Sequence, residues 1–295
     1  MSETHNKKPL EKPEWLRKRL PLDATVMGVG TGLRKRNLHT ICEEGLCPNM
    51  GECFSKNVAT LLIMGKNCTR NCSFCGVSAA KPLPLDIDEP EKVAEEVSEL
   101  GLKFVVVTSV TRDDLNDGGA EHFARVTEAI KERCPGVGVE LLIPDFGGST
   151  DLLDIVLHAE PHILSHNMET AESLYMSVRP QADYKRSLGI IEYTAKIKTA
   201  LVKSGFMLGL GETFDEMRKV MKDLHDAGCQ MITIGQYLCP SPLHYPVQEY
   251  IHPDIFKEYE AEAKAIGFLS VASGPFVRSS YLAEKFYNEL LEQIK

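Results

Sequence analysis

The sequence has no long apolar run, and this absence limits the class of protein that it can encode. Its first fifteen residues, MSETHNKKPLEKPEW, are polar and include acids. They therefore resemble neither a secretory signal, which needs an apolar core, nor an Arg-rich, acid-poor transit helix. No apolar stretch approaches the length of a membrane-spanning helix. We expect a soluble, cytoplasmic protein that does not bind membranes.

The chain also lacks low-complexity segments and any stripe of interleaved aromatic and basic residues. Its net charge of −9 is uneven, because residues 1–40 carry a balance of +5 and the remainder carries −14. An acidic body without an aromatic-basic stripe argues against a nucleic-acid partner. The basic arm could steer an acidic protein partner, or it could be a solvated segment that covers one end of the domain.

Runs of hairpin turns are missing as well, and apolar strand-like segments alternate with amphipathic ones. Strands are predicted over residues 58–64, 103–108, 138–143, 162–165, 203–208 and 231–234. Helices are predicted over residues 91–100, 120–133, 149–159 and 213–227, with two more within 169–201. Six βα units predict an α/β fold with a curled parallel sheet. Because a closed barrel needs eight, we expect a partial (β/α)6 TIM-like barrel.

Residues 1–40 show little periodicity, so we expect an irregular extension there. The glycines of GVGTG, residues 28–32, do not indicate a dinucleotide-binding loop, because no strand precedes them and no apolar helix follows. By contrast, the loops after the six predicted strands are rich in Gly, Pro, His, Asn, Asp and Arg. The carboxyl ends of parallel strands gather on one face, where ligands bind. We expect the functional site on that face.

Six of the nine cysteines fall between residues 42 and 75, in two triplets. The first triplet, Cys42, Cys47 and Cys53, has the spacing C-x4-C-x5-C, and the second has the spacing C-x3-C-x2-C. In a reducing compartment such clusters indicate metal rather than disulfides. Three thiolates on a four-iron cube leave one iron open to another ligand. A structural zinc site, which wants a fourth Cys or His close by, is the alternative.

The second triplet lies in CTRNCSFC, directly after a predicted strand, and this segment resembles the radical SAM superfamily. The resemblance implies a 4Fe-4S cluster on Cys68, Cys72 and Cys75, whose open iron binds S-adenosylmethionine (SAM). It also implies that Phe74 lies beside the adenine of SAM, although Phe74 could equally be a packing residue.

Two further segments resemble cofactor-binding parts of the same superfamily. KSGFMLGLGET is similar to the pattern G-x-I-x-G-x-x-E and implies SAM contacts at Gly205, Gly209 and Glu212. The glycines could otherwise belong to a plain strand-to-helix turn. The loop after the second predicted strand lies where relatives hold the methionine end of SAM. The contacts implied there are Arg112, Asp113, Gly118 and Gly119.

The first triplet narrows the resemblance to the lipoyl synthase family. HTICEEGLCPNMGECF, HNMET, TIGQYLCPS and VASGPFVRSSY are similar to that family, and the resemblance runs from Pro13 to Tyr281. It implies a second, auxiliary 4Fe-4S cluster on Cys42, Cys47 and Cys53, with Ser280 as fourth ligand or Ser279 in its place. Either serine could instead cap a last helix predicted over residues 281–294.

The resemblance also implies an activity. The auxiliary cluster would donate two sulfur atoms to carbons 6 and 8 of an octanoyl group on a lysine of a lipoyl carrier domain or glycine-cleavage H protein. Ser280, Cys42, Cys47 and Cys53 would then be catalytic. An external electron donor and an iron-sulfur carrier that rebuilds the cluster would be further partners. No acid-base dyad is expected, because saturated C–H bonds have no acidity to exploit.

The chain would divide into three parts: residues 1–57 as an N-terminal extension with the first triplet, residues 58–272 as the barrel, and residues 273–295 as a C-terminal segment. The two extensions would cover the open mouth of the barrel. Two alternatives stay open. One is another sulfur-inserting radical SAM enzyme that acts on a small molecule, and the other is a non-catalytic iron-sulfur or zinc protein.

Overall fold

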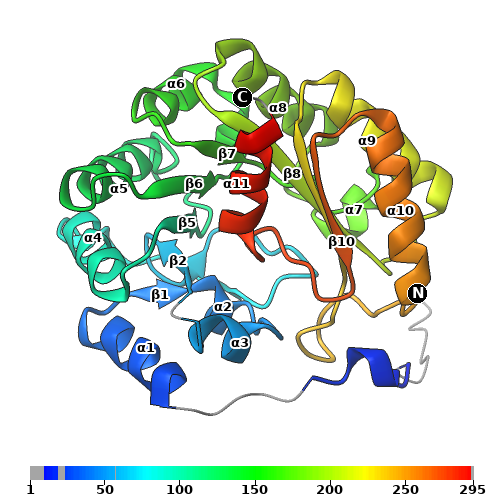
Figure 1. The fold of residues 1–295 in the computed structure, drawn as a ribbon, viewed down its shortest axis with the longest axis horizontal. Coiled ribbons are helices and arrows are strands. Elements are labelled where there is room, and N and C mark those ends of the chain that lie inside the picture. The colour runs from blue at the N-terminus through cyan, green and yellow to red at the C-terminus, as the bar shows by residue number, and fades with distance from the viewer. Residues whose placement is uncertain (1–9, 19–23, 57, 294–295) are drawn as a thin grey trace.

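The computed structural model describes residues 10–18, 24–56 and 58–293, and its centre is one curved sheet (Figure 1). The strand order is β1-β2-β5-β6-β7-β8-β9-β10. All neighbours pair in parallel except β1, which is antiparallel to β2. The strands are β1 (His39–Thr40), β2 (Thr60–Ile63), β5 (Phe104–Ser109), β6 (Gly138–Leu142), β7 (Ile163–Ser165), β8 (Leu201–Leu208), β9 (Met231–Gln236) and β10 (Ser270–Gly274).

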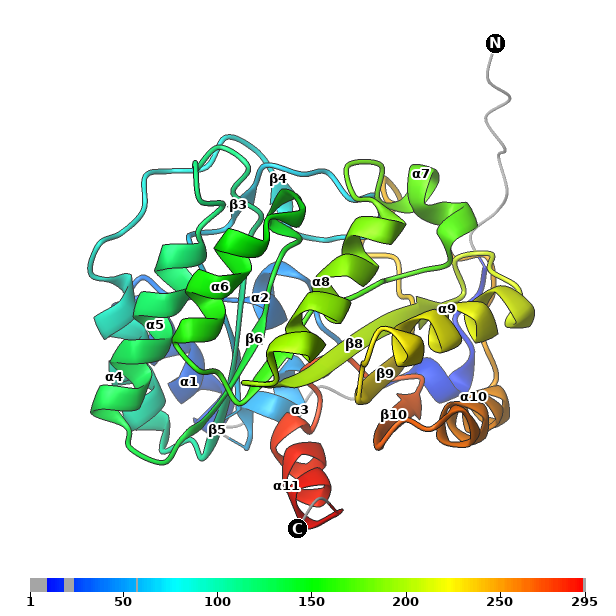
Figure 2. The same ribbon diagram turned by 90° about the horizontal axis from the view of Figure 1, so that it is seen from above.

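The helices between these strands lie on the outside of the curved sheet (Figures 1 and 2). They are α4 (Glu89–Leu100), α5 (Ala120–Arg133), α6 (Thr150–His158), α7 (Tyr175–Val178), α8 (Tyr184–Ile197), α9 (Phe214–Asp226) and α10 (Pro253–Ile266). Within the described residues β1 and β10 do not pair with each other, so the barrel stays open. The predicted partial (β/α)6 barrel is confirmed. No helix in the described part of the chain has both the length and the apolar character to cross a membrane.

Local sequence signals explain where several of these helices begin and end. Ser149 caps α6 by accepting a hydrogen bond from the N–H of Leu152. Thr213 and Glu216 form a capping box at the start of α9, each side chain bonding to the other's backbone N–H. Gly101 ends α4 with a φ of +64°, a conformation that costs glycine little. The sequence predicted these helices to within two residues at either end.

Three elements differ from the predictions. Helix α1 (Ala24–Lys35) contains residues 28–32, so the expectation of irregular structure is wrong for that part of the first forty residues. Residues 1–9 and 19–23 lie outside the described residues. Helix α10 and strand β10 were not predicted, and β10 extends the parallel sheet beyond β9. Val29 and Leu33 of α1 are buried, which shows that packing outweighs the low helix propensity of its glycines.

The last described helix of the chain lies at the amino ends of the strands. Helix α11 (Ala283–Gln293) packs against the first residues of three strands, Phe104, Ile163 and Met231, at their amino ends. Figure 2 shows α11 pointing away from the loops that carry β3 (Asn67–Cys68) and β4 (Ser78–Ala79). The predicted last helix is present over these bounds, and residue 294 lies outside the described residues. Within the described C-terminal segment, only the residues before α11 reach the loop side of the barrel.

Candidate active site

A cavity of about 500 Å³ opens at the carboxyl ends of the strands, as the distribution of polar loops predicted. Its wall includes residues that follow β5, β6, β7, β9 and β10, and it also includes the loop after β2. We call this space the cysteine cavity, because six cysteines line it: Cys42 and Cys47 of the first triplet, Cys68, Cys72 and Cys75 of the second, and Cys239 from the loop after β9. Segments separated in sequence therefore bring their thiols to one space.

The first triplet is held by two short helices, α2 (Ile41–Glu44) and α3 (Met50–Phe54). The N–H of Cys47 donates to the carbonyl of Cys42 at 3.0 Å, which closes the turn between the helices. Cys53 lies on α3 and does not belong to the described cavity wall. Burial raises the pKa of Cys42 to about 12 and that of Cys53 to about 11. These thiols hold their protons at neutral pH and must release them when a metal binds.

The residues before α11 lie beside the first triplet. Ser279 and Ser280 line the cysteine cavity together with Cys42 and Cys47. The side-chain amide of Asn49, between Cys47 and Cys53, donates to the carbonyl of Phe276 at 2.6 Å. The hydroxyl of Tyr281 donates to the carboxylate of Glu52 at 3.3 Å. Helix α11 begins at Ala283, so the two serines lie in the turn that precedes it.

The second triplet lies in the loop of residues 65–76, which we call the second-triplet loop. The sulfur of Cys68 accepts hydrogen bonds from the N–H groups of Arg70 (3.4 Å) and Thr111 (3.3 Å). Burial raises the pKa of Cys75 to about 12 and also raises the pKa of Cys72. Backbone N–H donors directed at cysteine sulfur are typical of iron-sulfur sites, where they tune the cluster potential.

The other predicted site residues divide into two groups. Phe74 and Gly205 line the cysteine cavity. A Cβ on Gly205 would come within 2.3 Å of the Thr233 hydroxyl, so close strand packing requires glycine there. The described cavity wall does not include the second group, which consists of Arg112, Asp113, Gly118, Gly119, Gly209 and Glu212.

Members of the second group have partners within the fold. Glu212 accepts hydrogen bonds from the N–H groups of Gly209 (2.6 Å) and Leu210 (2.9 Å), so its carboxylate closes its own turn. The buried guanidinium of Arg112 pairs with Asp114 at 2.9 Å. Gly119 packs so closely on Met64 that a Cβ would lie 2.2 Å from its sulfur. These residues shape the loops around the cysteine cavity rather than its wall.

Polar residues of the segment HNMET also line the wall. His166 follows β7, and its Nδ1–H donates to the carbonyl of Ile143 at 2.9 Å, which leaves its buried Nε2 without a partner in the described structure. Burial, and then the charge of Arg179, lower the pKa of His166 to about 4, so the ring is neutral. Burial also raises the pKa of Glu169 in the same wall. Their position directly after a strand was the available sequence signal.

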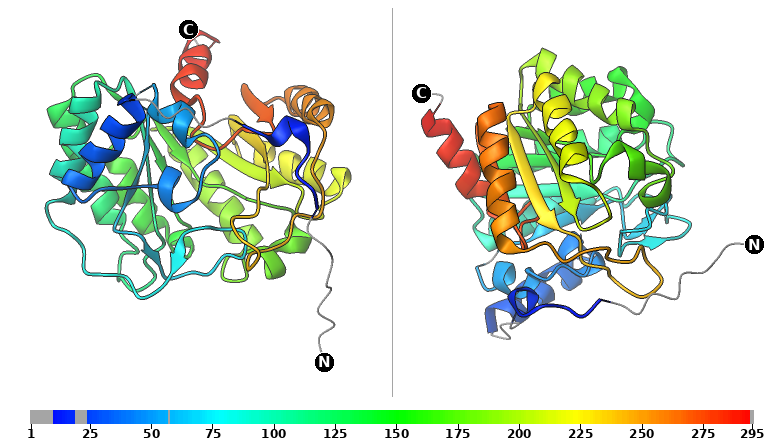
Figure 3. Two further views of the ribbon diagram at one scale, coloured as in Figure 1. Left: turned by 90° about the horizontal axis from the view of Figure 1, so that it is seen from below. Right: turned by 90° about the vertical axis from the view of Figure 1, so that its right-hand side faces the viewer.

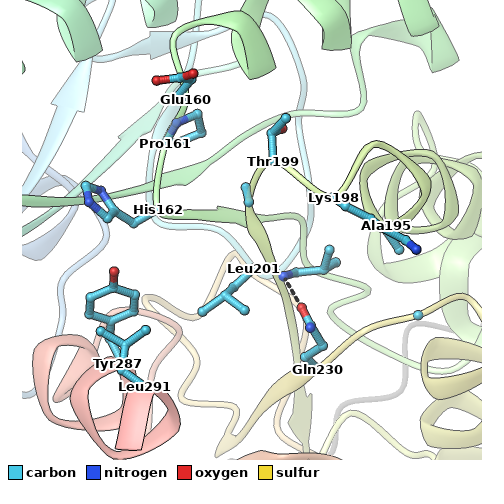
Figure 4. A pocket seen from close by; sticks show the side chains of 13 residues that line it. Glu160, Pro161, His162, Ala195, Lys198, Thr199, Leu201, Gln230, Tyr287 and Leu291 are labelled. Atoms are coloured by element: carbon cyan, nitrogen blue, oxygen red, sulfur yellow. Dashed lines mark hydrogen bonds between the residues drawn. The ribbon is translucent and has the colours of Figure 1, made fainter. Parts of the chain in front are cut away.

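A second hollow, of about 560 Å³, lies at the opposite end of the sheet (Figure 4). His162, Leu201 and Gln230 line it from the amino ends of β7, β8 and β9, and Tyr287 and Leu291 border it from α11. Its described wall contains no cysteine. The hollow is therefore separate from the cysteine cavity.

Comparisons with known proteins agree with this geometry. Residues 62–224, more than half of the chain, match the model of the radical SAM superfamily. Among solved structures, Streptococcus suis SuiB bound to its precursor peptide SuiA superimposes with a TM-score of 0.59 at 9% identity, over 77% of this chain and 52% of that one. Methylornithine synthase (PylB) gives a TM-score of 0.54 at 14% identity, over 86% and 79%. The fold and the cysteine cavity thus define a radical SAM protein.

The particular family follows from closer relatives. The lipoyl synthase of Caldicellulosiruptor bescii is 52% identical over 287 residues, which are 97% of this chain and 98% of that protein. The lipoyl synthase of Caldanaerobacter subterraneus is 51% identical over 276 residues, 93% and 96% of the two chains. The chain belongs to the lipoyl synthase family. Its cofactors are SAM and two 4Fe-4S clusters.

The cysteine cavity fits these cofactors. Its wall combines thiols from both triplets with serine hydroxyls and with the unpaired Nε2 of His166. All nine cysteines are free, so the thiols are available to iron. In the described part of the chain no three His, Cys, Asp or Glu side chains converge closely enough to hold a single metal ion. A cube binds each cysteine at a different iron, so its ligands lie farther apart than those of one ion.

Proposed function

We propose that this chain is a lipoyl synthase that inserts two sulfur atoms, at carbons 6 and 8, into an octanoyl group attached to a lysine of a carrier protein. The single observation that carries the proposal is the meeting of Cys42 and Cys47, the whole second triplet and Ser280 at one cavity. The substrate carbons are saturated, so the reaction needs radical chemistry, which the second cluster and SAM supply when bound.

Each set of residues has a distinct task in this proposal. Cys68, Cys72 and Cys75 hold the cluster that binds SAM. Cys42, Cys47, Cys53 and Ser280 hold the auxiliary cluster, which is consumed as the sulfur donor. A serine oxygen is a hard ligand among soft thiolates, so Ser280 is suited to leave when sulfur is withdrawn. The turn before α11, tied to Asn49 and Glu52, keeps Ser280 beside the first triplet.

The cavity wall orients the other groups. Phe74 packs with Val178, Leu210 and Tyr237 and offers its ring to the adenine of SAM. Gly205 brings bare backbone to the cavity, where the adenosine can approach. Arg112, Asp113, Gly118, Gly119, Gly209 and Glu212 act on SAM through the loops that they shape.

The three-part division of the chain supports the same roles. Residues 1–57 carry the first triplet, residues 58–272 form the barrel, and residues 273–295 carry Ser280, with β10 running through the second boundary. The carrier is an octanoylated lipoyl domain or a glycine-cleavage H protein. An external electron donor and an iron-sulfur carrier that rebuilds the auxiliary cluster complete the set of partners. Because the six ligand thiols are needed in reduced form, we infer that the protein works in the cytoplasm.

The test is anaerobic turnover with an octanoyl-lysine peptide, SAM and dithionite after reconstitution with iron and sulfide. Mass spectrometry follows sulfur insertion and the release of 5′-deoxyadenosine. C47S should abolish sulfur insertion, by about a thousandfold or more, and keep some SAM cleavage, whereas C72S should abolish both. C134S is the matched control, because Cys134 bonds to the carbonyl of Ala94 away from the cavity and should leave both activities unchanged. Full lipoyl product from C47S would contradict the division of roles.

A further inference from the structure

Arg70, which lies between Cys68 and Cys72, anchors the second-triplet loop through four side-chain hydrogen bonds. The hydroxyl of Ser73 in the same loop also donates to the carbonyls of Ser177 and Val178. The guanidinium of Arg70 donates through Nε and Nη2 to Asp113, at 2.8 Å each. It donates through Nη1 (3.0 Å) and Nη2 (2.7 Å) to Asp145. The Arg70 side chain is 8% exposed and that of Asp145 is fully buried. One side chain thus joins three loops, those after β2, β5 and β6.

The backbone before Arg70 bonds to the loop after β5, whereas the N–H of Asn71, after Arg70, donates to the side-chain oxygen of Gln181 at 2.7 Å. The N–H and the hydroxyl of Thr69 both donate to the carbonyl of Thr111 at 3.0 Å. The N–H of Asp113 donates back to the Thr69 hydroxyl at 3.1 Å. Together with the bond from the N–H of Thr111 to the sulfur of Cys68, these contacts fix the loop along the end of β5.

We propose that Arg70 is a positioning residue that holds the second-triplet loop in its cluster-binding conformation before iron arrives. The inference rests on the proposed function in taking the second triplet as the site of the SAM-binding cluster. Without an anchor, ordering this loop would have to draw on the free energy of cluster binding. With the anchor, the three thiols are presented in advance, and the cavity wall is already formed when SAM binds.

Arginine is specifically suited to this role. Its planar guanidinium carries five donors in a fixed fork and can bond to two carboxylates at once, whereas a lysine ammonium is a point charge. The surrounding charges balance, because Arg186, whose Nε lies 3.5 Å from Asp145, adds a second cation to the two carboxylates. R70K therefore keeps the net charge of this group of ionised side chains and removes the bridge between Asp113 and Asp145.

The first measurement is hydrogen exchange of the iron-free, full-length protein, resolved by peptide. In R70K the amides of residues 67–74 should exchange about tenfold faster or more, while peptides from the helices on the outside of the sheet keep their rates. R186Q is the matched control, since it removes a partner of the same Asp145 without touching the loop, and it should leave residues 67–74 unchanged. D113N leaves the buried bonds to Asp145 in place and should give a smaller acceleration in the same peptides.

The second measurement separates cluster binding from turnover. In full-length protein with the first triplet replaced by serine, all bound iron belongs to the second triplet. R70K should lose this iron to a chelator about tenfold faster or more than the same protein with Arg70 intact. The inference would be overturned if residues 67–74 of R70K and D113N exchanged at the wild-type rate. It would also be overturned if exchange accelerated evenly over all peptides. Neither readout depends on sulfur insertion, so a protein that loads iron and makes no lipoyl product would refute only the proposed function.

Discussion

The buried carboxyl group of Asp145 shows how a single residue in the site depends on its partner. Burial opposes its ionisation, but the hydrogen bonds and the charge of Arg70 outweigh burial and lower the pKa of Asp145 to about 2. A carboxyl group whose pKa falls on folding stabilises the folded state at pH values above its pKa in the unfolded chain. That contribution, about 2 kcal/mol, is lost as the pH falls through the folded pKa.

D145N should therefore destabilise the iron-free protein in a pH-dependent way. The difference in thermal midpoint between wild type and D145N should be largest at pH 6–7 and should shrink between about pH 5 and 2, because wild-type Asp145 becomes protonated and resembles the amide. Thermal unfolding followed by circular dichroism at a series of pH values measures this difference. A constant difference across that range would mean that the ionised form of Asp145 adds no stability.

The sequence singled out the triplet cysteines that line the cysteine cavity, because cysteine spacing is a local signal. It could not predict the partners of the polar residues. Asp113 appeared as a contact to SAM, whereas in the structure both its oxygens accept hydrogen bonds from Arg70, forty-three positions earlier. Asp145 lies outside the segments that carry the family resemblance, and His166 lies in HNMET, but only the fold reveals that they lie in the same wall.

At the scale of elements, the sequence predicted strands and helices with clear periodicity and failed where tertiary packing decides. Strand β10, SVASG, is built from small residues with weak strand propensity, and its pairing with β9 stabilises it. Helix α10 had a local signal, because His252 caps it and Pro253 occupies its first turn. Helix α11 was predicted, but its place at the amino ends of the strands follows only from the contacts of its apolar face.

Those contacts lead to a prediction for α11. Leu290 is fully buried among Phe104, Ile163 and Met231, so L290A should lower the free energy of unfolding by about 3 kcal/mol. E289A removes only an exposed pair with Lys285 on the same helix and should change stability by less than about 0.5 kcal/mol. Urea denaturation of the iron-free proteins measures both values. Because Leu290 packs at the amino ends of the strands and the cysteine cavity lies at their carboxyl ends, folded L290A should still load iron at both triplets. Loss of iron from one triplet alone would contradict this arrangement.

At the scale of the whole molecule, segments from the two ends of the chain meet across the open side of the barrel. Figure 3 shows the dark-blue segment around residues 14–16 beside the orange helix α10. Trp15 packs edge-on against His252 with ring centroids 5.1 Å apart. Lys18 bonds to Asn49 and Glu52, and these residues contact Phe276 and Tyr281. The open barrel thus lets residues from both termini form one wall of the cysteine cavity.

Asn49 is the centre of this junction, since it is 1% exposed and bonds to Lys18 and to the carbonyl of Phe276. N49A leaves that carbonyl without its donor and should cost about 1–3 kcal/mol. Because the junction holds Ser280 beside the first triplet, N49A should also lower the iron retained there, with the second triplet still loaded. Iron analysis and electron paramagnetic resonance of the reduced protein distinguish the two sites when each triplet is replaced by serine in turn.

K56M provides the control, because it removes only the exposed pair between Lys56 and Glu52 and should leave both iron sites as in wild type. If N49A lost iron equally from both triplets, the junction would stabilise the barrel as a whole. If it lost none, the residues before α11 would hold their place without Asn49. Selective loss of iron at the first triplet is the expected outcome. It would mean that segments from both ends of the chain, meeting at the open side of the barrel, build the site that donates sulfur.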